Sequence, residues 1–197
     1  MHTGDCFLVP GPVRMSNACL QAMATPVMTA RGAEFRKVMA NLNSGLRYAF
    51  DLTPSQPEMK TQSWTGEDGY RVVVVSGSGT AAMEMVIANR FRNNDLVLVP
   101  TNGKFGERVA DICRQFCNVK QLEYEWGRSF DLYELEQQLE RGCYEALLIC
   151  HNETSSGITQ DAEAIAEMCE RHGVSFILDG ITSVGGMPVH PAKWKAE

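Results

Sequence analysis

The sequence lacks the features that mark membrane-spanning, secreted and nucleic-acid-binding proteins. No apolar run among its 197 residues approaches the ~20 residues of a membrane-spanning helix. Its 18 basic residues are scattered, and 24 acidic residues leave a net charge of −6, so no basic patch is available for nucleic acid or an anionic membrane. The first residues contain no basic flank followed by an apolar segment, as a secretion signal would. We therefore expect a cytoplasmic protein that binds neither nucleic acid nor a membrane.

The spacing of the cysteines also argues against a metal site or a redox-active pair. The seven cysteines include no C-x-x-C pair, which argues against a zinc site or a redox motif. Cys113, Cys117 and Cys169 fall within the apolar patterns of predicted helices, so we expect buried thiols. The sequence thus predicts no metal site.

Between residues 72 and 178 the sequence does contain a regular alternation of short apolar runs and helical patterns. Such alternation is typical of a parallel sheet covered by helices on both faces, and the length allows one domain of this kind. We predict an α/β fold of three layers, α/β/α, with a mostly parallel sheet, preceded by a helix over 33–50. The expected strands are 72–75, 96–99, 119–124, 146–150 and 174–178, and the expected helices between them are 81–91, 105–116, 132–139 and 162–172.

The four valines at 72–75 continue directly into a glycine turn, residues 76–80, and then into a helical pattern. Gly77 and Gly79 let the backbone turn tightly and approach a ligand. The first amides of the helix lack intrahelical acceptors and lie at the positive end of the helix dipole. The turn is therefore a candidate phosphate-binding site, but the segment from Gly77 to Ala82 also reads G-x-G-x-x-A, so a dinucleotide-binding fold is an alternative.

In a parallel sheet the residues that follow the strands meet at one edge, where ligands bind. In this chain that edge would hold the glycine turn, the segments 101–105 and 151–155, and Asp179. A dinucleotide-binding fold places an acidic residue at the end of the second strand to bind ribose hydroxyls. Thr101 stands there instead, and Asp95 lies at the opposite end of that strand, which argues against a dinucleotide.

Four motifs share this predicted edge: SGSGT at 76–80, NGKFGER at 102–108, HNETSSG at 151–157 and DGITSVGG at 179–186. In order and spacing they resemble the class V pyridoxal-phosphate aminotransferases of fold type I. The likeness is greatest to alanine:glyoxylate or serine:pyruvate aminotransferases and to 2-aminoethylphosphonate:pyruvate aminotransferases. The arm at 10–12 and the segment 31–35 match as well, so the resemblance covers nearly the whole chain.

The resemblance implies pyridoxal 5'-phosphate as cofactor and gives roles to residues at this edge. Ser78, Gly79 and Thr80 would hold the cofactor phosphate through amides and hydroxyls. Phe105 would lie against one face of the pyridine ring, as an aromatic does in the family. Ile181 would close the opposite face.

Asp179 follows an apolar strand, where an unpaired charge would be costly, so a cationic partner is expected. The resemblance makes this partner the pyridinium nitrogen, whose proton lets the ring accept electrons. Thr154 would form a hydrogen bond near the ring hydroxyl, and Gly11 of the arm is a candidate substrate contact. His151 is expected to be a structural residue, because a histidine at a strand end is more often a satisfied structural group than a catalytic one.

The lysine that forms a Schiff base with this cofactor is not found in its expected context, so no catalytic residue is predicted. In the family it lies on the strand after the aspartate, whereas Lys193 and Lys195 follow too closely and lack that context. We expect residues 1–30 to form an N-terminal arm and residues 31–197 a partial cofactor-binding large domain, incomplete at its C-terminus and without the small C-terminal domain.

The expected function is transfer of an amino group from a small donor to a 2-oxo acid such as pyruvate or glyoxylate, in a homodimer as the family implies. The donor would be of the alanine, serine or 2-aminoethylphosphonate type. Three alternatives remain open. The chain could be a catalytically inactive truncated fragment that binds the cofactor weakly or not at all. It could be a cysteine desulfurase-like lyase, although those usually carry a histidine where Phe105 stands, or a dinucleotide-dependent oxidoreductase.

Overall fold

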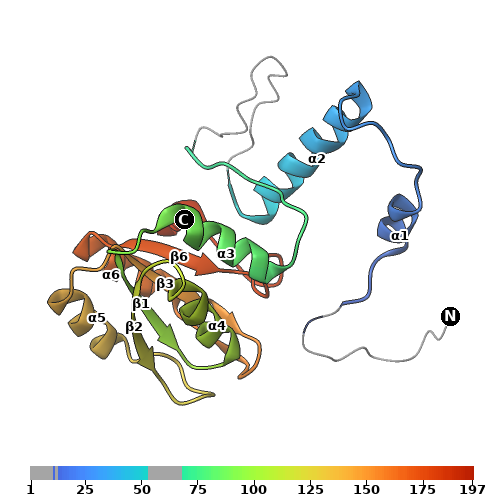
Figure 1. Ribbon diagram of the computed structural model, residues 1–197. Helices are drawn as coiled ribbons and strands as arrows, with labels where there is room; N and C mark the ends of the chain where they lie inside the picture. The colour runs from blue at the N-terminus through green and yellow to red at the C-terminus, as the bar shows by residue number, and fades with distance from the viewer. Residues whose placement is uncertain (1–10, 12, 53–67) are drawn as a thin grey trace, which may run out of the picture.

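The computed structural model describes residue 11 and residues 13–52 and 68–197 (Figure 1). Helices α1 and α2 stand to one side of a body in which a twisted sheet is flanked by helices. In chain order the elements are α1 (Asn17–Met23), α2 (Ala33–Ala49), α3 (Gly79–Arg90), β1 (Leu96–Thr101), α4 (Lys104–Cys113), β2 (Asn118–Glu123), α5 (Leu132–Arg141), β3 (Ala146–Cys150), β4 (Asn152–Glu153), β5 (Ile158–Thr159), α6 (Ala162–His172), β6 (Ser175–Asp179) and α7 (Pro191–Trp194).

The sheet has four parallel strands in the order β2-β1-β3-β6. After β2 the chain crosses back past β1 to form β3, so the strand order changes direction between β1 and β3. In open parallel sheets, ligands bind beyond the carboxyl ends of the strands at such a switch point. The antiparallel pair β4 and β5 follows directly on β3 and therefore lies at this edge.

Successive side chains of each strand enter two separate apolar cores. Val97 and Val99 of β1 pack with α3 and α4 on one face, whereas Leu98 packs with α5 and α6 on the other. This division follows from the two-residue period of a strand. Helices on both faces confirm the predicted three-layer fold.

Buried thiols contribute to both cores, as expected. Cys113 and Cys117 lie in the core formed with α3 and α4, and Cys169 lies on the buried face of α6. Burial raises the pKa of Cys113 and of Cys169 to about 12. Neutral thiols of this kind act as small apolar side chains.

Local signals set the limits of α6, which covers the predicted residues 162–172. Asp161 precedes the helix and accepts a hydrogen bond from the amide of Ala164 at 3.0 Å, which satisfies a donor that has no intrahelical acceptor. Gly173 ends the helix with a φ of 66°, a left-handed conformation that favours glycine.

The predicted strand at 72–75 is not formed. These residues belong to no strand, and Val73, Val74 and Val75 are 63%, 48% and 47% exposed. Valine favours strands, but a strand also needs a neighbour with which to form hydrogen bonds. None of the strands that the structure describes pairs with this run, so propensity alone does not produce a strand there.

Helix α2 is joined to the rest of the chain by a buried ion pair. Arg47, with no exposed side-chain surface, contacts Asp68 at 2.6 Å and donates to the carbonyl oxygen of Tyr70 at 2.9 Å. The Tyr70 hydroxyl in turn donates to the carbonyl oxygen of Pro191 at the start of α7, at 3.1 Å.

None of the helices in the described ranges is long and apolar enough to cross a membrane.

Candidate functional site

The glycine turn leads into the first turn of α3, as predicted. Ser78 is the N-cap, and its hydroxyl oxygen accepts a hydrogen bond from the amide of Ala81 at 3.2 Å. The amides of Gly79 and Thr80 stand in the first turn, where no intrahelical acceptor exists. This end of α3 therefore has the donors and the dipole orientation that a phosphate needs.

Gly79 and Ile181 come together at this end of α3. A Cβ atom added at Gly79 would lie 2.4 Å from Cδ1 of Ile181, so only glycine allows this approach without a shift of the isoleucine. The structure thus places the expected phosphate-binding turn against the residue expected to close one face of the cofactor ring. Ile181 itself is 60% exposed.

Asp179 ends β6 and has one satisfied and one unsatisfied carboxylate oxygen. Its Oδ1 accepts a hydrogen bond from the amide of Ile181 at 3.1 Å. Its Oδ2 is buried and has no hydrogen-bond partner among the described residues. Burial raises the pKa of this carboxyl, the hydrogen bond from Ile181 opposes the rise, and the negative charge of Glu153 adds to it. A cationic N–H donor would satisfy Oδ2 and reverse the effect of burial on the pKa.

A cavity of about 540 Å³ opens between α2, α3, β3 and β6. Gly79, Asp179 and Ile181 lie on its wall, whereas most of the remaining wall is apolar and includes Leu46 and Phe50 of α2. The other site residues predicted from the sequence are not part of this wall. The described cavity is therefore the Asp179 side of the site, and the Phe105 side lies next to it on α4.

Phe105 stands in the first turn of α4 and is connected to α3 through Arg108. The Arg108 guanidinium carbon lies 5.2 Å from the centroid of the Phe105 ring, and its Nη1 donates to the hydroxyl oxygen of Thr80 at 3.4 Å. Arg108 was not singled out in the sequence, although it ends the motif that contains Phe105. The contact brings a positive charge to the expected phosphate-binding turn.

Thr154 and Gly11 are the two remaining residues predicted for the site. Thr154 is half-buried in the turn between β4 and β5, directly after Glu153. Gly11 has a φ of 118° and stands between residues that the structure does not describe, so the arm at 1–30 that contains it is described only in part. Their roles toward cofactor and substrate stay predictions.

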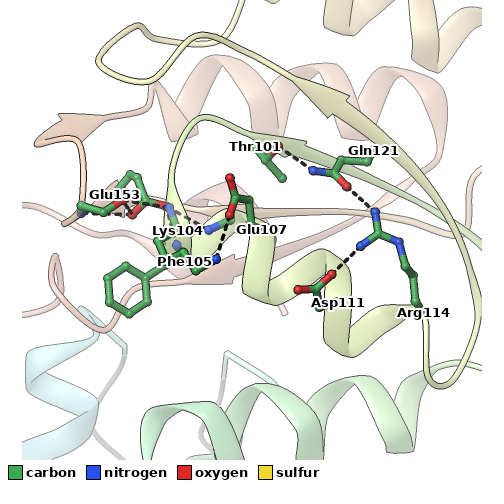
Figure 2. A network of polar contacts seen from close by, with 10 residues as sticks. Thr101, Lys104, Phe105, Glu107, Asp111, Arg114, Gln121 and Glu153 are labelled. Carbon is green, nitrogen blue, oxygen red and sulfur yellow. Dashed lines mark hydrogen bonds and ion pairs between the residues drawn. The ribbon is translucent and has the colours of Figure 1, made fainter.

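Glu153 is the site residue that sequence reasoning missed. It is 0% exposed, and its Oε2 accepts hydrogen bonds from the amides of Phe105 and Gly106 at 3.0 and 2.9 Å. Figure 2 shows it beside the first turn of α4, with the ring of Phe105 directed away from the polar network. The available signal was a carboxylate directly after a buried strand, next to a helix whose N-cap residue, Gly103, has no side chain to accept a hydrogen bond.

Thr101 is engaged within the sheet and leaves no polar group for a ribose. It is 3% exposed, and its hydroxyl oxygen accepts a hydrogen bond from Nε2 of Gln121 at 3.0 Å, as Figure 2 also shows. The position where a dinucleotide-binding fold needs an accessible acid is thus filled by a buried hydroxyl.

His151 and the two lysines near the end of the chain behave as surface and structural groups. His151 is buried, its Nδ1 lies 2.9 Å from the hydroxyl oxygen of Ser183, and burial lowers its pKa. Lys193 and Lys195 form ion pairs with Glu163 and Glu170 of α6. The contact of His151 agrees with the structural role expected from the sequence.

The chain is similar to known proteins over almost its whole length. The family profile described as "Aminotransferase class-V" matches residues 20–197. A (S)-ureidoglycine–glyoxylate transaminase of Bacillus subtilis (strain 168) is 28% identical over 192 residues, which are 97% of this chain and 42% of that protein. An alanine–glyoxylate aminotransferase of Rattus norvegicus is 28% identical over 185 residues, 93% of this chain and 41% of that protein.

A crystal structure gives the same result. The alanine–glyoxylate aminotransferase from Nostoc sp. matches with a TM-score of 0.83 and 31% identity, over 100% of this chain and 50% of that one. The chain thus spans at most about half the length of these relatives. Since the family profile covers residues 20–197 and the fold agrees, the chain belongs to the class V aminotransferases, a family that depends on pyridoxal phosphate.

Proposed function

We propose that this chain is the cofactor-binding part of an enzyme that transfers an amino group from a small amino donor to a 2-oxo acid such as pyruvate or glyoxylate. The donor would be of the alanine, serine or 2-aminoethylphosphonate type. Membership of the class V family supports the reaction type. The two relatives and the Nostoc protein are all named for reactions with glyoxylate, which favours a small 2-oxo acid as acceptor.

The buried Oδ2 of Asp179 carries this proposal. When bound, pyridoxal phosphate supplies a ring that accepts the electron pair left behind when a proton leaves the substrate carbon. Asp179 would hold a proton on the ring nitrogen through Oδ2, which has no partner among the described residues. The cavity beside it has room for a ring of this size.

The remaining residues would orient the cofactor. Ser78 can donate its hydroxyl hydrogen to a phosphate while its oxygen still accepts from the amide of Ala81. The amides of Gly79 and Thr80 would complete the phosphate contacts. Phe105 and Ile181 would enclose the ring between them.

The alternatives differ in specific residues. Phe105, where cysteine desulfurases usually carry histidine, favours transamination over lyase chemistry. The buried Thr101 and the family match disfavour a dinucleotide oxidoreductase. A catalytically inactive fragment remains the alternative that only binding experiments separate from the proposal.

The test is a titration of this chain with pyridoxamine 5'-phosphate, followed by calorimetry. This form of the cofactor carries an amine instead of an aldehyde, so its binding does not require the Schiff-base lysine. We expect binding by the unsubstituted chain and about a tenfold loss of affinity in Asp179→Asn, since a hydrogen bond to a charged group contributes roughly 1.5–3 kcal/mol.

Asp161→Asn is the matched control, because it makes the same chemical change at the N-cap of α6. It should bind pyridoxamine phosphate with unchanged affinity. Absence of binding by the unsubstituted chain would support the inactive fragment. Binding of NAD in place of pyridoxamine phosphate would overturn the proposal.

We also propose that the full-length protein is a homodimer, as the resemblance implies. Several apolar side chains near the N-terminus are exposed in the part of the chain that the structure describes, and a dimer interface would bury them. Sedimentation velocity of the full-length protein should give the mass of two chains, and a monomer at micromolar concentration would contradict this. The exposed side chains are Val13, Met15, Leu20, Met23, Val27 and Met28.

A further inference from the structure

We propose that Glu153 is a positioning residue that fixes Phe105 against one face of the cofactor ring. This inference rests on the proposed function and concerns how the same site is held. Glu153 does not reach the cavity itself, so it would act through the backbone of α4. Its contacts with α4, together with those of Ser155, are called the Glu153 cap below.

The Glu153 cap satisfies the whole first turn of α4 from outside the helix. Oε2 of Glu153 accepts from the amides of Phe105 and Gly106 at 3.0 and 2.9 Å. The hydroxyl oxygen of Ser155 accepts from the amide of Lys104 at 2.8 Å. Ser155 is in turn held by Oε1 of Glu153, which accepts from its amide at 3.1 Å and from its hydroxyl at 2.6 Å. Both oxygens of one carboxylate are therefore used, and the negative charge lies at the positive end of the helix.

The backbone at Gly103 approaches Glu153 and Ser155 so closely that a side chain at this position would displace them. A Cβ atom at Gly103 would lie 2.4 Å from Cγ of Glu153 and 2.6 Å from the hydroxyl oxygen of Ser155. A serine or aspartate at this N-cap position would have capped α4 locally. The helix is instead capped by residues 47 to 51 positions away in the sequence, which ties its start to the β4–β5 hairpin.

The hairpin also reaches the opposite side of the expected ring site. Thr154, the residue expected to contact the ring hydroxyl, directly follows Glu153. Asn152, which precedes Glu153, accepts hydrogen bonds from the hydroxyl of Thr182 at its carbonyl and amide oxygens, at 2.9 and 3.1 Å. Thr182 is the neighbour of Ile181. The hairpin therefore connects the Phe105 side and the Ile181 side, and Glu153 sets the position of the former.

The experiment is a double-mutant cycle with Glu153→Gln and Phe105→Leu, in which the affinity for pyridoxamine 5'-phosphate is measured by calorimetry. The glutamine keeps the shape of the side chain, but its NH₂ group cannot accept a hydrogen bond. Glu153→Gln alone should weaken binding about threefold to tenfold, the range that one aromatic stacking contact accounts for. When Phe105→Leu is already present, the same substitution should have no further effect, because the two residues act through one contact.

A second readout is the induced circular dichroism of the bound cofactor ring, measured at saturation. It reports the asymmetry of the ring's surroundings and should change in Glu153→Gln. Asp131→Asn is the matched control, because Asp131 caps α5 by accepting from the amides of Tyr133 and Glu134 at 2.9 and 3.1 Å. It should lower stability without changing affinity or dichroism. If Glu153→Gln does not fold, Ser155→Ala removes only the acceptor for the Lys104 amide and should show the same effects at smaller size.

The outcomes separate the two proposals. If the unsubstituted chain binds pyridoxamine phosphate and Glu153→Gln binds it with unchanged affinity and dichroism, the positioning role is overturned while the proposed function stands. If Glu153→Gln costs the same affinity whether or not Phe105→Leu is present, the positioning role is also overturned, because Glu153 would then not act through Phe105. If the unsubstituted chain does not bind, both proposals fail together.

Discussion

Two carboxylates lie at the carboxyl ends of the neighbouring strands β3 and β6, and they differ in how fully their oxygens are hydrogen-bonded. Glu153, just after β3, accepts hydrogen bonds at both oxygens and is fully buried. Asp179, at the end of β6, accepts one from the amide of Ile181 and keeps a buried Oδ2 without a partner in the described part of the chain. A satisfied carboxylate holds the framework, whereas an unsatisfied one is available to a ligand. The stability of the cofactor-free chain should therefore respond oppositely to changes at the two positions.

The largest expected effect is that of Glu153→Ala on stability. The substitution leaves the part-buried amide of Phe105 and the buried amide of Gly106 without their acceptor. Each unsatisfied donor costs about 1–3 kcal/mol, so the free energy of unfolding should fall by roughly 3 kcal/mol. Urea denaturation followed by circular dichroism measures this. A loss below about 0.5 kcal/mol, the size typical of a surface substitution, would contradict the framework role of Glu153.

Alanine substitutions at Gly103 and Gly79 should differ in the stability they cost, with the larger loss at Gly103. At Gly103, an alanine Cβ would meet the buried Glu153 and Ser155 side chains, and overpacking of this kind destabilises by about 1–3 kcal/mol. At Gly79, it would meet only the end of the exposed Ile181 side chain, which can rotate away, so a loss of less than about 1 kcal/mol is expected. Thermal unfolding of Gly103→Ala and Gly79→Ala side by side tests the contrast, and equal losses would refute it.

The smallest expected effect on stability is that of Asp179→Asn. The hydrogen bond to Oδ1 can be kept while a buried charge is removed, so the cofactor-free chain should lose no stability and gain up to about 1 kcal/mol. A clear loss of stability in Asp179→Asn would show that Oδ2 has a structural partner.

The stability difference between Asp179→Asn and the unsubstituted chain should depend on pH in a defined direction. Burial raises the pKa of Asp179 in the folded state, so the folded chain holds this proton more tightly than the unfolded chain. The contribution of Asp179 to stability is then fully present below the unfolded pKa of about 3.9 and is lost as the pH rises through the raised folded pKa. The advantage of Asp179→Asn should therefore grow in urea titrations as the pH rises above about 3.9. An advantage that shrinks with rising pH would contradict the raised pKa.

The sequence predicted those parts of the structure that depend on local pattern. Residues 162–172 form α6 as expected, because Asp161 and Gly173 supply a cap at each end. Asp179 ends β6 at the carboxyl edge of the sheet, as the rule that parallel strand ends meet at one edge predicts. The prediction of a strand at 72–75 was wrong, because the strand propensity of valine does not supply a neighbouring strand for pairing.

The role of Glu153 could not be predicted, for a physical reason. Its partners, the amides of Phe105 and Gly106, are separated from it by 48 and 47 residues. They approach it only because β1 and β3 are neighbours in the sheet. Strand order was not predicted from this one sequence, and without it a carboxylate after a strand has no identifiable partner. The same holds for the contact of Arg108 with Thr80 across two helices.

The pairing of β1 with β3 also fixes an order of events during folding. Val97 lies opposite Ala146, so pairing of β1 with β3 closes a long loop. Contacts of this kind form slowly, because the chain loses conformational entropy before the stabilising contacts are made. The first turn of α4 cannot receive its cap until this loop is closed. We therefore expect α4 to form early as a helix but to acquire a fixed N-terminal end late, which would make the aromatic side of the site among the last features to become native.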